Sequence, residues 1–225
     1  MLVIRIIIEI IIFIYMVRMS IKIKQHKIKK NRRTRMIMIF WIIIFVIVVP
    51  YSACIPVENF FITFKTPEQA FRYENWLVSK GEIQDVIYGR DSCFVIIKQK
   101  EKNDCVSFDS ECYKKVSSGY KFIGSFDVGA ESISGKGDIL WHVNGTKDYY
   151  LSGYKWSDNI EEAIDVSDNL GTEFIQKSGK TEEYDDVKIY TNEYYGYVYD
   201  MTDQYEIYID GESYKPTFEY KYSFP

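Results

Sequence analysis

DILWHVNGTKDYYL, residues 138–151, is the stretch that decides the fold. Apolar and aromatic residues lie on both sides of Asn144-Gly145. An Asn-Gly pair accepts the positive φ angles that a type I′ turn requires, so the stretch predicts two antiparallel strands joined by a tight turn. It is the clearest hairpin signal in the chain, and it indicates a protein built mainly from β-strands.

Further strand signals lie on both sides of this hairpin. Short runs rich in Val, Ile, Tyr and Phe alternate with turn residues such as Gly89-Arg90-Asp91 and Asp210-Gly211. The runs are 81–88, 92–99, 105–116, 120–124, 173–176, 186–190, 194–201, 205–209, 212–214 and 218–224. We therefore expect a mainly β (α+β) fold of about ten short strands, an antiparallel sheet or sandwich. It occupies residues 56–225, with possible subdomains 57–126 and 127–225.

One helix is expected before the strands. Thr66-Pro67-Glu68-Gln69 is a helix start, because the Thr66 side chain can accept from the Gln69 amide and Pro67 needs no hydrogen-bond partner at the first helical position. The helix should run from Pro67 to about Val78. Its broad apolar face should dock on a sheet; the face consists of Ala70, Phe71, Tyr73, Trp76, Leu77 and Val78. A short strand at 60–64 and a second short helix at 158–164 (DNIEEAI) are also possible.

An export segment precedes this domain. Met36–Val49 is uncharged and apolar, and residues 18–35 before it contain nine Lys or Arg and no acid. Fourteen apolar residues are fewer than the roughly 20 that span hydrocarbon and fit the h-region of a signal peptide. Cations beside an apolar segment stay on the cytoplasmic side. Residues 36–55 are therefore a signal or transmembrane segment, and the domain after it is expected outside the cell, at the cell membrane.

The end of this segment allows three outcomes. Tyr51-Ser52-Ala53-Cys54 resembles the lipobox of bacterial lipoproteins at three of its four positions, and Tyr51 is the departure from that pattern. The resemblance implies cleavage before Cys54 and lipidation of its thiol. The alternatives are an uncleaved anchor covering Met36–Ile55, and cleavage with release.

Residues 1–35 form a leader with two interpretations. Leu2–Val17 is almost wholly apolar but is interrupted by Arg5 and Glu9. It could be a first membrane helix, which would make a helical hairpin with the basic segment inside the cell. It could instead be translated upstream of the true start, with Met16 or Met19 as the initiator, and this second reading is slightly favoured.

The exported part is acidic. Residues 1–35 hold 10 of the 28 Lys and Arg but one of the 32 Asp and Glu, so the remainder has 18 cations and 31 acids. A domain with this balance repels phosphate backbones, so we expect no nucleic-acid partner. The expected partners are the membrane and a cell-surface glycan or protein.

Cysteine offers a possible disulfide. An oxidising exterior permits one, and Cys105 and Cys112 are the nearest pair in the sequence. The alternative is separate small apolar residues on strands. The spacing of the four Cys matches no zinc motif, so no metal site is predicted.

Tyrosine supplies the candidate binding site, because 11 of the 20 tyrosines fall between residues 184 and 222. Tyr195, Tyr197 and Tyr199 alternate with Gly196 and Val198, so they share one strand face. Tyr208 could line up on a neighbouring strand. An exposed row of flat rings would stack a sugar or a peptide. The alternative is aromatic pairing across strands that stabilises the sheet.

Catalysis is poorly supported. His142 is the one histidine outside the basic leader, and no nucleophile elbow, phosphate-binding Gly loop or dinucleotide fingerprint is present, so we predict no catalytic residues and no cofactor. Acidic clusters at 165–169, 182–186 and 200–203 could bind calcium weakly, but they fit solvated loops better.

The stretch from Thr66 to Ile97, which contains TPEQAF, GEI and DVIYGRDSCFVI, resembles uncharacterised exported proteins of low-GC Gram-positive bacteria. The resemblance implies the compartment and no activity. The sequence thus predicts a membrane-anchored extracytoplasmic domain that serves as a non-enzymatic cell-surface binding module. The alternatives are an immunity or inhibitor protein of the envelope that binds a protein partner, and an unusual hydrolase.

Overall fold

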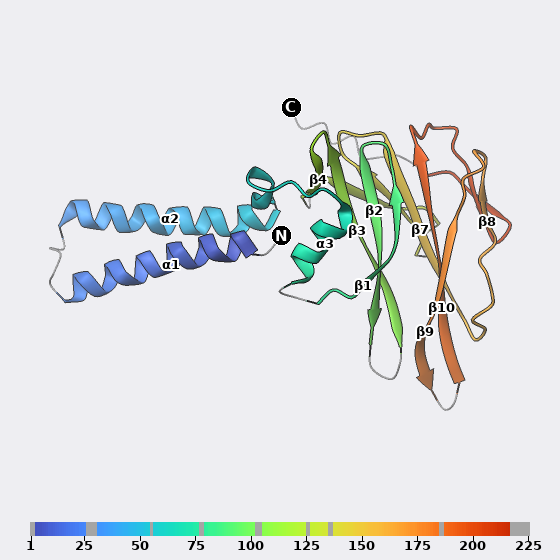
Figure 1. The fold of residues 1–225 in the computed structure, drawn as a ribbon, viewed down its shortest axis with the longest axis horizontal. Helices are drawn as coiled ribbons and strands as arrows, with labels where there is room; N and C mark the ends of the chain where they lie inside the picture. The colour runs from blue at the N-terminus through green and yellow to red at the C-terminus, as the bar shows by residue number, and fades with distance from the viewer. Residues whose placement is uncertain are drawn as a thin grey trace.

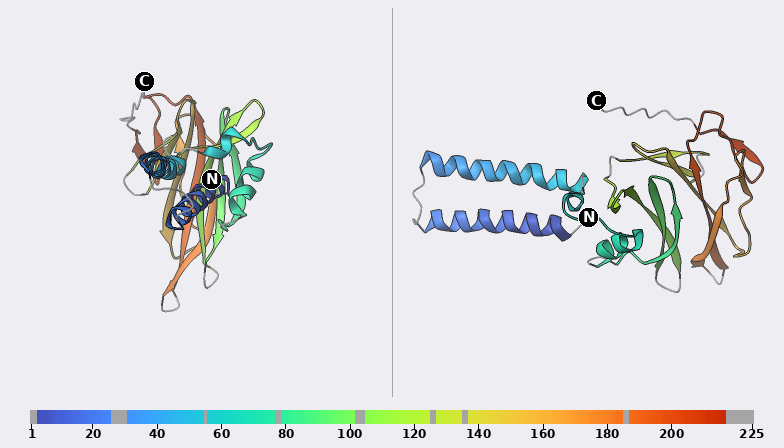
Figure 2. Two further views of the ribbon diagram at one scale, coloured as in Figure 1. Left: turned by 90° about the vertical axis from the view of Figure 1, so that its left-hand side faces the viewer. Right: turned by 45° about the horizontal axis from the view of Figure 1, so that its top comes forward.

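A computed structural model describes residues 3–25, 31–54, 56–76, 79–101, 105–124, 127–134, 137–184 and 187–216. Two antiparallel helices, α1 (Val3–Lys24) and α2 (Arg32–Cys54), form a hairpin that projects from a β-rich body (Figure 1). The Tyr15 ring packs against Trp41 across this hairpin, with ring centroids 4.8 Å apart. The other views in Figure 2 show the same separation between hairpin and body. A short 3-10 helix, η1 (Val57–Phe60), and α3 (Pro67–Asn75) connect the two parts.

The strands form three antiparallel sheets in the described residues, which confirms the mainly β fold. Sheet A has the order β1-β2-β3-β4, and sheet B has the order β5-β6-β7-β10-β9. Sheet C has the order β12-β11-β8. The bounds are β1 Glu82–Tyr88, β2 Ser92–Lys100, β3 Val106–Val116, β4 Gly119–Phe122, β5 Val128–Ser132, β6 Ile139–Val143, β7 Asp148–Ser157, β8 Val166–Asp168, β9 Ile175–Tyr184, β10 Val187–Tyr199, β11 Ile207–Ile209 and β12 Glu212–Tyr214.

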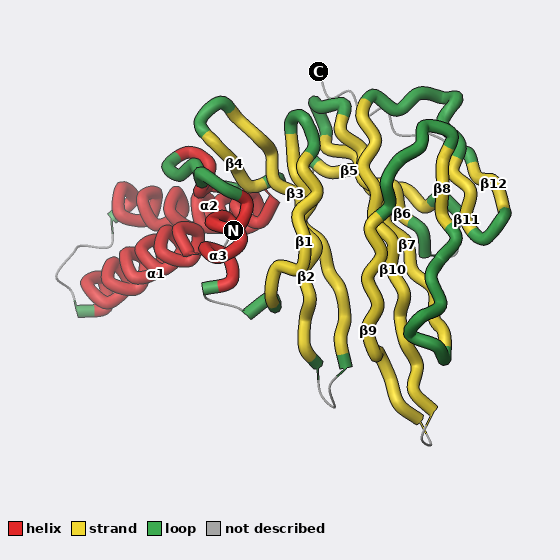
Figure 3. The backbone as a smooth tube through the Cα atoms, turned by 45° about the vertical axis from the view of Figure 1, so that its right-hand side comes forward, coloured by secondary structure: helices red, strands yellow, loops and turns green. Residues whose placement is uncertain are grey.

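The layers stack in the order α3, sheet A, sheet B and sheet C (Figures 1 and 3). Strand β2 shows how the sequence produces this, because its alternate side chains are buried on both faces. Val95 and Ile97 pack toward α3, whereas Phe94 and Ile96 pack toward sheet B. Sheet B in turn buries its opposite face, including Leu151, against sheet C. Continuous apolar runs such as SCFVII are typical of a strand covered on both sides.

Helix α3 begins as the sequence predicts. The Gln69 amide donates to the Thr66 hydroxyl at 3.4 Å, and the Lys65 amide donates to the Gln69 side chain at 3.0 Å. Ala70 and Phe71 are buried against sheet A. The prediction that Trp76 joins this buried face is wrong, because Trp76 caps the helix C-terminus and is 73% exposed. Leu77 and Val78 lie outside the described residues.

Two turns differ from expectation. The connection after β6 covers four residues, 144–147, and Gly145 alone has positive φ there, so the expected type I′ turn at Asn144-Gly145 is wrong. Thr146 explains the wider turn, since its hydroxyl donates to the Val143 carbonyl and accepts from the Asp148 amide. Asp210 and Gly211, with φ of 50° and 79°, supply a type I′ geometry between β11 and β12 instead.

Other local predictions were also corrected. The segment 158–164 forms one turn and a loop, not a helix, because the Asn159 side chain accepts from the Glu161 amide and Ile164 bonds to the Gln176 side chain. Residues 57–60 are 3-10 helix, and in the expected strand 60–64 Phe64 makes one isolated bridge. Two predicted strands merge into the long β10, which makes a projecting hairpin with β9 (Figure 3).

Candidate functional site

The helical hairpin has an apolar surface. Large apolar side chains that are at least 40% exposed are distributed along both α1 and α2. They are Ile7, Ile10, Ile11, Phe13, Ile14, Tyr15, Val17 and Ile21 on α1, and Met36, Ile39, Phe40, Ile42, Ile43 and Val46 on α2. Contiguous apolar surface of this extent marks an interaction site, because soluble monomers rarely leave it in water.

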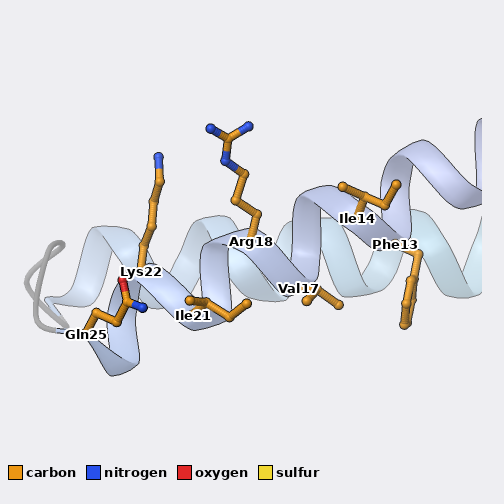
Figure 4. A pocket seen from close by; sticks show the side chains of 7 residues that line it. All are labelled: Phe13, Ile14, Val17, Arg18, Ile21, Lys22 and Gln25. Atoms are coloured by element: carbon orange, nitrogen blue, oxygen red, sulfur yellow. The ribbon is translucent and has the colours of Figure 1, made fainter.

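A shallow hollow of about 450 Å³ follows this surface (Figure 4). Phe13, Ile14, Val17 and Ile21 provide its apolar lining, and all its lining residues belong to α1 except Gln25, which directly follows the helix. Arg18 and Lys22 point to one side of it near the connection between the helices (Figure 4). A groove made by a single helix cannot enclose a small ligand, so the hollow belongs to the apolar surface and is not a separate binding pocket.

Within the part of the chain that the structure describes, no helix combines the length and the apolar character needed to cross a membrane. Residues Tyr51–Cys54 form the last turn of α2, and the Cys54 side chain lies outside the described part of the chain. Lipidation of Cys54 therefore stays a prediction.

The three alternating tyrosines of β10 do share one face, but that face is the inner one of the A–B sandwich. Tyr195 is 2% exposed and packs on Phe94, with ring centroids 6.1 Å apart. Burial, together with the charge of Glu193, raises the pKa of Tyr195. The exposed row predicted from the sequence is therefore wrong at Tyr195, and the alternative of aromatic packing describes it.

The other predicted tyrosines are also engaged or elsewhere. The Tyr197 hydroxyl donates to Asp148 at 2.8 Å, and the Arg90 guanidinium lies 3.7 Å from the centroid of the Tyr199 ring. Tyr208 belongs to β11 of sheet C and does not line up with the β10 tyrosines. Ligand binding by these four residues stays a prediction, without the shared exposed surface that motivated it.

Asp148 is the centre of a buried polar network between sheets A and B. Its side chain has no exposed surface. It accepts from the Asp91 amide at 2.8 Å, the Arg90 amide at 3.2 Å, the Ser92 hydroxyl at 2.7 Å and the Tyr197 hydroxyl at 2.8 Å. Four donors satisfy a buried carboxylate and offset its desolvation. These hydrogen bonds thus hold the β1–β2 turn against sheet B.

The polar network around Asp148 was not predicted from the sequence, for a physical reason. Asp148 lies 56 to 58 positions from the donors of the β1–β2 turn and 49 from Tyr197. Apart from the polar side chain at the first position of a strand, no sequence signal could have identified it.

Comparison with known proteins assigns no role to these residues. The chain matches no protein-family model, no curated protein and no solved structure.

A second polar cluster lines a cavity of about 240 Å³. The Lys80 ammonium lies 2.8 Å from a Glu74 oxygen and also bonds to Glu111. Burial and the nearby charge of Glu74 raise the pKa of Glu111, and Tyr113 donates to the Glu111 carboxylate at 2.6 Å. The cavity is smaller than the roughly 300–1,000 Å³ of most ligand pockets, and the ammonium already lies between the carboxylates. The cluster ties the loop after α3 to β3.

The remaining predicted chemistry has structural explanations. His142 stacks on Tyr149 with ring centroids 4.6 Å apart, and its Nε2 lies 3.3 Å from the Thr146 carbonyl. Cys105 and Cys112 are thiols, so the predicted disulfide is wrong. Cys112 is on extended β3 and Cys105 immediately precedes that strand, so the two residues are seven positions, about 23 Å, apart along the chain. No group of metal-ligating side chains occurs in the described residues.

One exposed aromatic pair stands out on sheet B. Tyr154 and Trp156 lie on the same face of β7 as the buried Tyr150, and exposure rises from 0% at Tyr150 to 44% and 67%. Their ring centroids are 5.9 Å apart. Glu193 lies opposite Tyr154 on β10, and burial raises its pKa to about 7. This open end of the inner face is where flat rings reach solvent.

Proposed function

We propose that this chain is a membrane-anchored module whose hairpin lies in lipid and holds the β-sandwich outside the cell. The observation that carries the proposal is the apolar surface of α1 and α2, on which fourteen large side chains are at least 40% exposed. Lipid is the partner that fits an elongated apolar surface carried by both helices of a hairpin.

The free energy of transferring these apolar side chains from water into lipid supports the proposal. Burying a large aliphatic or aromatic side chain completely contributes about 1.5–3 kcal/mol, so a half-exposed one contributes about 1 kcal/mol when it is covered. The fourteen side chains together then favour transfer into lipid by about 10–20 kcal/mol. That is as large as the whole stability of a typical domain, which makes an uncovered hairpin a strongly disfavoured state in water.

The charge pattern gives the orientation. Lys22 and Lys24 end α1, and Arg32 begins α2, so the basic residues gather at the connection between the helices. Cations at this end favour the cytoplasmic face, where anionic lipid and the membrane potential hold them. The sandwich is attached at the opposite end of the hairpin (Figure 2). In the proposed orientation it therefore lies outside the cell.

Cysteine labelling tests the orientation. In a Cys54→Ser background, intact cells carrying either Glu161→Cys or Lys24→Cys are treated with a membrane-impermeant maleimide. Both positions are exposed, Glu161 in the sandwich and Lys24 at the basic end. We expect labelling at Glu161→Cys alone, and at both positions after the cells are opened. Equal labelling in intact cells contradicts the proposal.

The intact mass of the membrane-bound protein tests the anchor itself. A mass that retains residues 36–53 supports the hairpin. A mass that begins at Cys54 and includes lipid contradicts the hairpin, because a lipid chain on Cys54 would then replace it as the anchor.

The binding role of the sandwich centres on Tyr154 and Trp156. We propose a cell-surface glycan as the ligand, because open, flat rings at the end of a sheet supply stacking area at little entropic cost. The hydroxyl-rich face of a sugar can also bond to the nearby Glu193 carboxyl.

A matched substitution tests this role. The detergent-solubilised chain is incubated with purified cell-wall glycan, and bound protein is measured for Trp156→Ser and for Tyr88→Ser. Tyr88 is 55% exposed on sheet A and serves as the control. We expect Trp156→Ser to lower binding at least tenfold and Tyr88→Ser to leave it unchanged. Equal retention by wild type and Trp156→Ser refutes the glycan site, and co-purification of a stoichiometric protein would indicate the immunity-protein alternative.

A further inference from the structure

Three aromatic side chains next to the hairpin are the most exposed large apolar residues of the described chain. Phe60 is 75% exposed, and Phe61 and Trp76 are each 73% exposed. Phe60 is the last residue of η1, and Trp76 caps the C-terminus of α3. Each lies more open than Trp156, the next aromatic ring in order of exposure. We call these three residues the aromatic collar.

The collar lies on the side of the sandwich that the hairpin leaves. Figure 1 shows η1 at the end of α2, and α3 turned so that its C-terminal end faces the hairpin. Figure 2 shows the same arrangement from another direction. Phe60 follows Cys54, the last residue of α2, by six positions, and η1 also contacts α1. The η1 part of the collar therefore adjoins the end of the hairpin.

The collar is held in place by firm contacts. The Asn59 side chain donates to the Phe122 carbonyl at 2.8 Å and accepts from the Phe122 amide at 3.0 Å. Lys121 donates to the Asn59 carbonyl at 2.9 Å. These bonds fix η1 on β4 and so hold the backbone of Phe60 and Phe61 at the end of the sandwich near the hairpin. Trp76 is held by α3, whose Phe71 is buried against sheet A.

The spacing along the hairpin matches a bilayer. Met36, the first residue after the basic run, and Cys54 are the ends of a 19-residue segment of α2. At 1.5 Å per residue this segment is about 28 Å long, close to the roughly 30 Å of a hydrocarbon core. With the cations at one interface, the collar therefore reaches the other one. Aromatic rings are enriched at that depth, because they combine an apolar body with a preference for the headgroup region.

We propose that Phe60, Phe61 and Trp76 insert into the interfacial zone of the outer leaflet and seat the sandwich directly on the membrane. The inference rests on the proposed function, since it requires the hairpin to lie in the same bilayer. The collar gives the sandwich a fixed orientation in place of a free tether. Sheet A, behind α3, then lies nearest the lipid, and sheet C lies farthest from it.

Quenching by brominated lipids tests the proposal on the full chain in proteoliposomes. The chain has four tryptophans. Trp41 belongs to the hairpin and Trp76 to the collar, whereas Trp141 and Trp156 belong to sheet B. If both membrane-side rings contact lipid, roughly half of the emission is quenchable. Trp76→Phe should lower that share to roughly a third, and Trp156→Phe should raise it to roughly two thirds.

Bromine depth separates the two membrane-side residues. Bromines placed near the headgroups should quench the part of the emission that Trp76→Phe removes, and bromines near the bilayer centre should quench Trp41 more strongly. Trp76→Phe and Trp156→Phe both alter exposed rings, so neither should affect folding, and circular dichroism of the sandwich checks this.

The outcomes are distinguishable. Quenching of Trp41 together with an unchanged quenchable share in Trp76→Phe overturns the collar and leaves the membrane anchor in place. Absence of quenching for Trp41 as well overturns the anchor, and the collar with it. A quenchable share that falls in Trp156→Phe would place the opposite side of the sandwich on the lipid, and this also overturns the collar.

Discussion

Replacing Asp148 by Ala should destabilise the sandwich more than almost any other single polar change. The carboxylate accepts from two backbone amides and two hydroxyls. Two of those donors keep another partner: Ser92 stays 2.9 Å from the Tyr150 hydroxyl, and the Arg90 amide can still donate to Tyr197 at 3.1 Å. The Asp91 amide and the Tyr197 hydroxyl lose their acceptor outright.

The magnitude follows from these losses. A buried donor left without a partner costs about 1–3 kcal/mol, and each lost bond to a charged acceptor about 1.5–3 kcal/mol. Removing the buried charge returns part of its desolvation penalty. We expect a net loss of about 3–5 kcal/mol for Asp148→Ala, a large share of the 5–15 kcal/mol typical of a domain. Asp148→Asn keeps one acceptor oxygen and should lose less.

Urea unfolding of the full chain in detergent, followed by tryptophan fluorescence at pH 7, measures the effect as a shift of the midpoint at constant slope. Asp200→Asn is the matched control. Asp200 pairs with Lys147 at 2.7 Å, but both side chains are more than half exposed, so its loss should stay below about 1 kcal/mol. Asn also tolerates the φ of 54° at this position. A decrease in the free energy of unfolding below about 1 kcal/mol for Asp148→Ala would refute the stabilising role of the network around Asp148.

Three further predictions concern pH, packing and capping. Burial raises the pKa of Glu193 from 4.5 to about 7, so the folded chain holds a proton that the unfolded chain releases. The free energy of unfolding should therefore fall by about 2–3 kcal/mol as the pH rises through this window. Glu193→Gln should remove that loss, measured as the difference between the urea unfolding midpoints at pH 5 and pH 8. An identical pH dependence in both proteins would contradict this. Gly153→Ala should cost about 1–3 kcal/mol in urea unfolding, because its Cβ would overlap the Asp138 carboxylate and the Tyr194 ring, whereas Gly129→Ala, with its nearest atom 3.9 Å away, should be nearly neutral. Thr66→Ala should lower stability by about 1 kcal/mol, and Thr66→Ser should restore it; no difference between the two would exclude the cap.

Local chemistry was predictable from the sequence, and contacts between distant layers were not. The cap at Thr66 and the β1–β2 hairpin depend on residues within a few positions of each other, and both were predicted. The shared face of Tyr195 and Tyr197 follows from strand periodicity alone. Which faces are covered depends on how the sheets stack, so the burial of Tyr195 could not be inferred.

The candidate sites divide in the same way. The apolar and basic segments of the hairpin are visible in the sequence, because they are runs of composition and do not depend on contacts between distant residues. The exposure of Trp76 was missed, since a ring on the apolar side of a short helix is ordinarily assigned to the core. Trp76 is exposed because it lies at the helix terminus, beyond the last buried turn.

The order of the sheets along the chain also sets a sequence of folding events. Sheet A is complete at Phe122, before any strand of sheet B has been synthesised. One of its faces, with Phe94 and Ile96, then has no cover until β7 and β10 arrive.

About thirty residues separate the end of β7 from the start of β10, its neighbour at the centre of sheet B, so β7 has no partner on that side until they have been made. During synthesis, which begins at the N-terminus, the chain therefore exposes an uncovered apolar sheet face and an unpaired strand edge until β10 is made. Incomplete sheets aggregate under these conditions. Chains truncated just before Val187 should accumulate as insoluble protein, and holding by a chaperone should matter most in that interval.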